Sequence, residues 1–273
     1  MDIFFLIISS LLVGLVIGLL SGLLGIGGGT IMVPAFKLIF GLPAIASTAT
    51  SLFTVIPTSI SGAFVHIRKK TCIPLLGIAA GLGGACTSPL GVWLASLSPE
   101  WAIMTAAALV IAYSAITMFA KAMKMRGKSV SADAKAQGEA SLDSLRDIPA
   151  RKLIPLGALI GAAAGVMSGY VGVGGGFLMV PLFMQLLKTP MKLTSGTSLI
   201  AIIIIAIPGT ITNAVMGNID WIAGIFVALG AIPGAAIGSR LISRIPEFQL
   251  RLLFSGFLIV AAALLVINEM GIL

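Results

Sequence analysis

The stretch SGLLGIGGGTIMVPAF at residues 21–36 occurs again as SGYVGVGGGFLMVPLF at residues 168–183, with 10 of the 16 positions identical. The offset between the two copies is 147 residues, and it also pairs further positions along the chain, including Pro43 with Pro190, Thr50 with Thr197 and Pro99 with Pro246. Since the matches run along nearly all of each half, the chain is predicted to be an internal duplication.

Long segments without Lys, Arg, Asp or Glu surround both copies. Hydrophobic residues make up 58% of the chain and charged residues 10%, whereas a soluble domain carries about 25% charged residues. The uncharged segments are residues 3–36, 38–67, 71–99, 153–187 and 193–219. Each exceeds the about 20 residues that cross a bilayer as a helix, and lipid offers the backbone no hydrogen bonds. The sequence therefore predicts an all-α, polytopic integral membrane protein.

The two copies are separated by a segment of different composition. Residues 121–152 contain no aromatic residue, mix both charge signs with Ser, Ala and Gly, and carry eight Lys or Arg. This composition is typical of a linker, and its basic residues favour the cytoplasmic side of a membrane. We therefore expect a first membrane repeat over residues 1–120, a cytoplasmic linker over 121–152 and a second membrane repeat over 153–273.

Counting predicted spans outward from this linker gives the topology. Both termini then face the extracytoplasmic side of the cell (inner) membrane, and the two repeats, of about four to five helical segments each, are inverted. Sixteen of the 17 basic residues face the cytoplasm, Lys37 being the exception. Trp93, Trp101 and Trp221 fall near the outer interface, where aromatic residues are enriched. Inverted repeats recur in secondary transporters, whose site lies at the repeat interface near the midplane.

Each copy of the motif carries four glycines in five positions within an otherwise apolar segment. Glycine destabilises a helix interior, so we expect a break in the first helix of each repeat, either as a re-entrant hairpin or between a full crossing and a short returning helix. A helix that restarts after the break presents free N–H groups and a positive dipole end, which suits an anion. The alternative is close packing of helices through small residues. The candidate anion-binding residues are Gly25, Gly27, Gly28, Gly29 and Thr30 in the first copy, and Gly172, Gly174, Gly175 and Gly176 in the second.

Hydroxyl side chains follow each glycine cluster, at the predicted start of the next helix. They can cap that helix or donate to an anion beside the glycines, and both interpretations stay open. The residues placed furthest into the helix are Thr50, Ser51, Thr197 and Ser198. Asn213 is a further polar candidate, either as a ligand or as a hydrogen-bonding contact between helices. His66 precedes the basic run at 68–70 and is expected at the membrane interface rather than in a proton relay.

No Asp or Glu is predicted deep in the bilayer, whereas cation pumps and proton relays usually need one. A hydrolase needs a nucleophile with a base, or a metal cluster, and the sequence offers neither, so we expect no catalysis, no metal and no cofactor. The net charge of +8 follows from the positive-inside rule and does not indicate nucleic acid. The expected partners are a small anion and the lipid bilayer, and the oligomeric state stays open.

The paired G-x-G-G-G-x₂-M-V-P motifs, the inverted halves and the basic central linker resemble the sulfite exporter TauE/SafE family of membrane permeases over essentially the whole chain. The resemblance implies export of small sulfur-containing anions such as sulfite or organosulfonates, without distinguishing among them. A passive anion channel and a transporter of another small oxyanion are the alternatives.

Overall fold

The computed structural model describes residues 3–125, 150–187 and 189–242, together with short runs of positions between 245 and 263. Most of these residues are helical, and none of them lies in a strand. In chain order the helices are α1 (Ile3–Leu24), α2 (Gly29–Leu38), α3 (Ala44–Arg68), α4 (Pro74–Leu97), α5 (Glu100–Met125), α7 (Ala150–Val171), α8 (Gly176–Leu186), α9 (Met191–Val215) and α10 (Trp221–Leu241).

Six of the described helices are long and apolar enough to cross a membrane, namely α1, α3, α4, α7, α9 and α10. Their outward faces carry large apolar side chains that no described residue covers; Leu159 is 69% exposed, and Leu82 and Ile211 are each 58% exposed. A continuous apolar surface of this kind is unfavourable in water and favourable in lipid. The all-α, polytopic membrane architecture predicted from the sequence is thereby confirmed.

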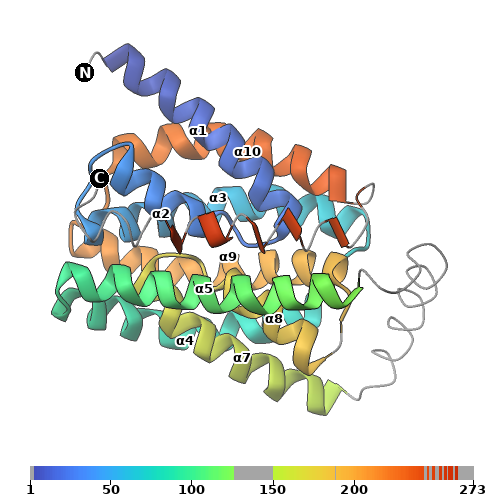
Figure 1. The fold of residues 1–273 in the computed structure, drawn as a ribbon. Helices are drawn as coiled ribbons and strands as arrows, with labels where there is room; N and C mark the ends of the chain where they lie inside the picture. Colours follow the sequence, from blue (N-terminus) through green and yellow to red (C-terminus); the bar gives the residue numbers. More distant parts are fainter. Residues whose placement is uncertain are drawn as a thin grey trace.

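The helices pair across the boundary between the repeats (Figure 1). Helix α1 lies along α10, α4 lies along α7, and α3 packs against α9 between these two pairs. Gly14, Gly18 and Gly22 of α1 lie so close to backbone carbonyls of α10 that a Cβ at any of them would overlap a carbonyl oxygen. Small residues at four-residue spacing allow membrane helices this close approach. Helices of the two repeats therefore pack against each other, and the repeats do not form separate bundles.

Two equivalent contacts fix the relative direction of α3 and α9. Thr50, near the start of α3, accepts a hydrogen bond of 3.0 Å from the N–H of Asp220, which lies between α9 and α10. Thr197, near the start of α9, accepts one of 2.9 Å from the N–H of Ile73, which lies between α3 and α4. Each helix therefore begins where the other ends, so the two run antiparallel. This is the relation that inverted repeats require, and it supports the predicted inversion.

Charged residues at the helix ends fall into two groups. The Nζ of Lys69, after α3, donates to the carbonyl oxygen of Arg240 in α10 over 2.8 Å. The Nζ of Lys37, near the end of α2, lies 4.0 Å from Oε2 of Glu100, the first residue of α5. Helix α4 separates the two groups, as the predicted topology requires. That the side of Lys69 is cytoplasmic stays a prediction.

The helices reach into both ends of the predicted linker at 121–152. Helix α5 continues to Met125, and α7 already begins at Ala150. Ala, Met and Lys, which make up the first of these extensions, are good helix formers. Residues 126–149 lie outside the described residues, as do both predicted extracytoplasmic ends, at 1–2 and 264–273.

Candidate functional site

The breaks predicted at the two glycine clusters are present. Residues 25–28, here called the first glycine loop, separate α1 from α2, and residues 172–175, the second glycine loop, separate α7 from α8. Three glycines in each loop have φ between 72° and 85°, in the left-handed region. They are Gly25, Gly27 and Gly28 in the first loop and Gly172, Gly174 and Gly175 in the second. Only glycine adopts this conformation at little cost, so the backbone itself requires these residues.

The two glycine loops touch each other. A Cβ built on Gly29 would lie 2.5 Å from the carbonyl carbon of Val173, and one built on Gly176 would lie 2.9 Å from the Cα of Ile26. The two contacts are equivalent, because Gly176 lies 147 residues after Gly29 and Val173 lies 147 residues after Ile26. Both involve backbone atoms, which cannot turn aside as a side chain can. The first residue of α2 therefore lies against the second loop, and the first residue of α8 against the first loop.

A serine of each central helix holds the loop of the opposite repeat. Ser51 of α3 donates from Oγ to the carbonyl oxygen of Gly172 over 2.8 Å, and Ser198 of α9 donates to the carbonyl oxygen of Gly25 over 2.6 Å. Both serines are fully buried. A hydroxyl has one proton to donate, and in these two residues the protein already uses it. The geometry gives Ser51 and Ser198 the role of positioning the loops.

The other polar candidates are also bonded within the protein. Thr50 and Thr197 accept the N–H groups that precede α10 and α4, and Thr197 further donates to the carbonyl of Leu193 over 2.7 Å. Asn213 donates to the carbonyl of Gly209 over 3.1 Å and accepts from Asn218 over 3.2 Å. These contacts favour the capping and helix-contact interpretations for the three residues. The threonines cap helices of the opposite repeat rather than their own.

Four buried hydroxyls near the glycine loops have no hydrogen-bond partner among the described residues: those of Ser21, Thr30, Ser59 and Ser168. Thr30, in the first turn of α2, was among the predicted site residues. Ser21 and Ser168 were not singled out from the sequence. Their one signal was their shared position, as the first residue of each copy of the repeated motif.

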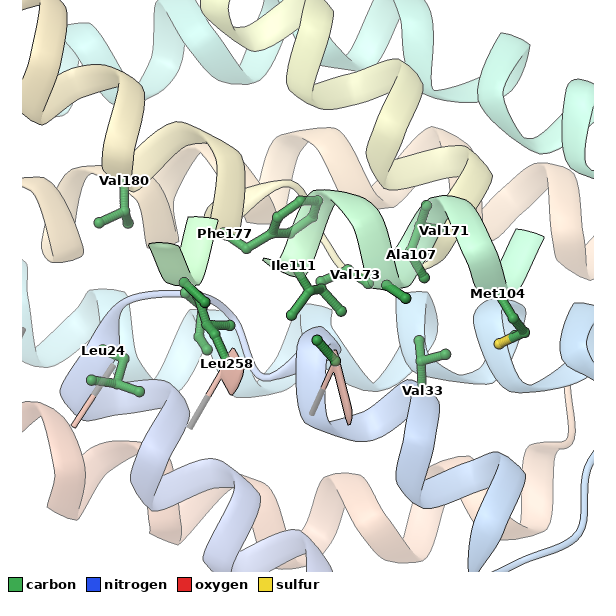
Figure 2. Close-up of a cluster of buried hydrophobic side chains, with 14 of the residues drawn as sticks. Leu24, Val33, Met104, Ala107, Ile111, Val171, Val173, Phe177, Val180 and Leu258 are labelled. Atoms are coloured by element: carbon green, nitrogen blue, oxygen red, sulfur yellow. The ribbon is translucent and has the colours of Figure 1, made fainter. Parts of the chain in front are cut away.

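The loops lie in a buried region in which the described residues supply hydroxyl groups but no charged side chain. The described buried residues include no Asp, Glu, Lys or Arg. Figure 2 shows α5 lying across this region, with Ile111 and Ala107 close to Val173 of the second loop and to Phe177 of α8. Electrostatic interactions are stronger in such a low-dielectric region than in water. The arrangement therefore offers two positive helix ends that no charged side chain among the described buried residues offsets.

His66 is buried inside the protein, and its position at the membrane interface stays a prediction. The side chain is fully buried in the last turn of α3, and its Nδ1 lies 2.8 Å from Oγ1 of Thr71. Ser59, Gly62 and His66 share one face of α3, and all three are buried. This helical periodicity directs His66 toward the protein interior.

Known proteins resemble the chain over nearly its whole length. The family model described as "Sulfite exporter TauE/SafE" matches residues 10–265. The "Probable membrane transporter protein YdhB" of Bacillus subtilis is 28% identical over 242 residues, which cover 88% of this chain and 92% of that protein. YunE of the same organism, with the same description, is 25% identical over 237 residues, 84% of each chain.

The resemblance extends to an archaeal protein. The "Probable membrane transporter protein MJ0441" of Methanocaldococcus jannaschii is 27% identical over 262 residues, 91% of each chain. No solved structure gives a significant match. The family match includes both glycine loops and all of the described spanning helices except the first residues of α1. The chain is a membrane transporter that belongs to the sulfite exporter TauE/SafE family.

Proposed function

We propose that the protein exports small sulfur-containing oxyanions, such as sulfite or organosulfonates, through a site at the paired glycine loops. The observation that carries the proposal is the contact between the loops, which sets the first residues of α2 and α8 against each other's loop in a region without charged side chains. The N-terminus of a helix carries a partial positive charge and unpaired N–H groups. Two such ends together attract an anion and repel a cation.

The shape of the substrate fits neutral donors on two sides. A sulfite or sulfonate group presents three oxygen acceptors around one sulfur, so N–H groups from both loops have an oxygen to bind. In the first loop, the earliest N–H groups to find a partner in α2 are those of Ile31 and Met32, which both donate to the carbonyl of Gly28. The N–H groups before them have no acceptor within the helix. We assign ligand contact to the backbone at Gly28, Gly29, Gly175 and Gly176.

The site without fixed charges suits transport in the outward direction. A buried Lys or Arg would form an ion pair with the substrate, and breaking a buried ion pair is costly; helix dipoles bind the anion and still permit release. Expelling one negative charge from a cell with a negative interior is favoured by about 2.3 kcal/mol at 100 mV. Export of an anion can therefore proceed without a coupling cation, in agreement with the lack of carboxylates among the described buried residues.

Reconstitution in liposomes tests the proposal directly. Vesicles that contain the purified protein would be loaded with sulfite, sulfate, thiosulfate, methanesulfonate or chloride, and efflux would be followed at a set membrane potential. We expect saturable efflux and counterflow for sulfite or the sulfonate, and no flux of Na⁺ or K⁺. Efflux of none of the sulfur oxyanions would refute the assigned substrate class. Large ohmic currents without counterflow would instead assign the protein as an anion channel.

A further inference from the structure

Ser21 and Ser168 occupy the same place in the two repeats, one helical turn before each glycine loop. The carbonyl oxygen of Ser21 accepts the N–H of Gly25, and that of Ser168 accepts the N–H of Gly172, both over 2.8 Å. These are the last helical hydrogen bonds before the two breaks. Each serine is therefore fixed by the rigid end of α1 or α7, next to a loop whose own backbone conformation only glycine can adopt.

Both side chains are fully buried, and neither hydroxyl has a hydrogen-bond partner among the described residues. A serine in a helix commonly donates to the carbonyl four residues earlier, as Thr54 and Thr58 do in α3. Ser21 and Ser168 do not. A buried hydroxyl without a partner is unfavourable, and such groups are uncommon in folded proteins. Two such hydroxyls at equivalent positions of the two repeats indicate that a ligand, and not a group of the protein, accepts their hydrogen bonds.

The neighbours of the glycine loops place the side chain of Ser21 close to the start of α2. A Cβ built on Gly28, which caps α2 in the left-handed conformation, would lie 3.3 Å from the Cβ of Ser21. In the second repeat, the Cβ of Gly175 would contact Ala164, one turn before Ser168 on the same helix. Gly28 therefore faces α1, which carries Ser21, and Gly175 faces α7, which carries Ser168.

We propose that Ser21 and Ser168 each donate a hydrogen bond to an oxygen of the transported anion, together with the first N–H groups of α2 and α8, so that each repeat supplies one half of the site. The inference rests on the proposed function and names ligand residues for it. The chemistry required of the ligand is a small oxyanion with at least two acceptor oxygens. Halide ions, which have no separate oxygen acceptors, are poor ligands for such a pair of half-sites.

The two halves differ in one respect. Thr30, in the first turn of α2, adds a second buried hydroxyl without a partner on the side of Ser21, whereas the equivalent residue in α8 is Phe177. Ser59 of α3, also buried and without a partner among the described residues, lies against Gly27 of the first loop, and the equivalent residue in α9 is Ala206. The first half therefore has three such hydroxyls and the second has one. For this reason we expect the substitution of Ser168, the single hydroxyl of its half, to weaken anion binding more than the substitution of Ser21.

The test compares Ser21→Ala and Ser168→Ala with a matched control, Ser88→Ala. Ser88 of α4 is equally buried and also lacks a partner among the described residues; its hydroxyl lies against Gly209 of α9, and only its carbonyl lies against α7, at Gly169. None of the three substitutions removes a hydrogen bond made within the protein, so none should lower the unfolding temperature. We expect the KM for efflux to rise about tenfold in Ser21→Ala, as for the loss of one hydrogen bond to an anion, to rise further in Ser168→Ala, and to stay unchanged in Ser88→Ala.

A second readout separates failure of this inference from failure of the proposed function. The shift in unfolding temperature on adding sulfite, sulfate, phosphate or chloride would be measured for wild type and all three variants. Stabilisation of wild type by an oxyanion, reduced in both loop variants but not in Ser88→Ala, supports the half-sites even if the transported anion contains no sulfur. Sulfite efflux with an unchanged KM in both loop variants would overturn the inference and leave the proposed function intact. An equal rise of KM in Ser88→Ala, or no stabilisation of wild type by any oxyanion, would also overturn it.

Discussion

The substitution Gly29→Ala tests whether the contact between the glycine loops matters for transport. Gly29 does not have a positive φ, so alanine there meets no backbone strain of its own. Its Cβ would lie 2.5 Å from both the carbonyl carbon and the carbonyl oxygen of Val173, whereas non-bonded heavy atoms pack at about 3.5–4.0 Å. The methyl group must therefore push the two loops about 1 Å apart.

The expected effect follows from this displacement. A hydrogen bond of about 2.9 Å to an anion, lengthened by about 1 Å, is no longer a hydrogen bond. Losing one such bond to a charged ligand costs about 1.5–3 kcal/mol, which is roughly a ten- to hundredfold loss of affinity. Overpacking should also destabilise the fold, by about 1–3 kcal/mol. The KM for efflux should rise by that factor, while protein that stays monodisperse in detergent is still recovered.

Two further alanine substitutions calibrate the result. In Gly176→Ala the nearest backbone atom, the Cα of Ile26, is 2.9 Å away, and the closest atom belongs to the flexible side chain of Ile202, so the effect should be smaller. Gly41 has a φ of 65° and no atom within 4 Å of its Cβ position, so Gly41→Ala strains the backbone without any overlap and should transport normally. Wild-type KM and wild-type unfolding temperature in Gly29→Ala would refute the close contact of the loops as the basis of the site.

Other predictions concern the residues around the loops and the topology. Thr50→Val and Thr197→Val should lower the unfolding free energy by about 1 kcal/mol each, because the N–H groups before α10 and α4 lose their acceptors; an increased KM at unchanged unfolding temperature would instead place these hydroxyls on the anion. Ser51→Ala and Ser198→Ala should lower the unfolding temperature and raise the KM together, since they release the opposite loops, and a change in neither quantity would contradict a positioning role. A cysteine introduced at Lys135, in a protein without Cys72 and Cys86, should react with an impermeant thiol reagent only from the cytoplasmic side. Its labelling from outside in intact spheroplasts would overturn the assigned orientation.

Much of the fold was predictable because the same sequence motifs occur in both halves of the chain. The two glycine motifs each place glycine where a positive φ is required, so the breaks after α1 and α7 followed from the sequence alone. The pairing of α1 with α10 and of α4 with α7 did not follow, although glycines at four-residue spacing mark the contact faces. Such spacing shows that a close neighbour exists without identifying which helix it is.

The candidate site was predictable in its backbone and less so in its side chains. Thr50 and Thr197 stood out as hydroxyls near the loops, but their partners lie 170 and 124 residues away in sequence, and a contact at that separation is set by tertiary packing. Ser21 and Ser168 were overlooked because a lone serine in an apolar helix normally bonds to its own backbone. Only the structure shows that these two do not.

The most direct test of the central claim is a structure of the protein in lipid with sulfite, or with whichever oxyanion the liposome panel shows to be transported. The account predicts one anion between the two glycine loops, with its oxygens about 2.7–3.2 Å from N–H groups of both loops, near Gly28 and Gly175. An anion bound away from both loops, with the loops still in contact and no space between them, would contradict it and would leave the glycines as residues for close helix packing.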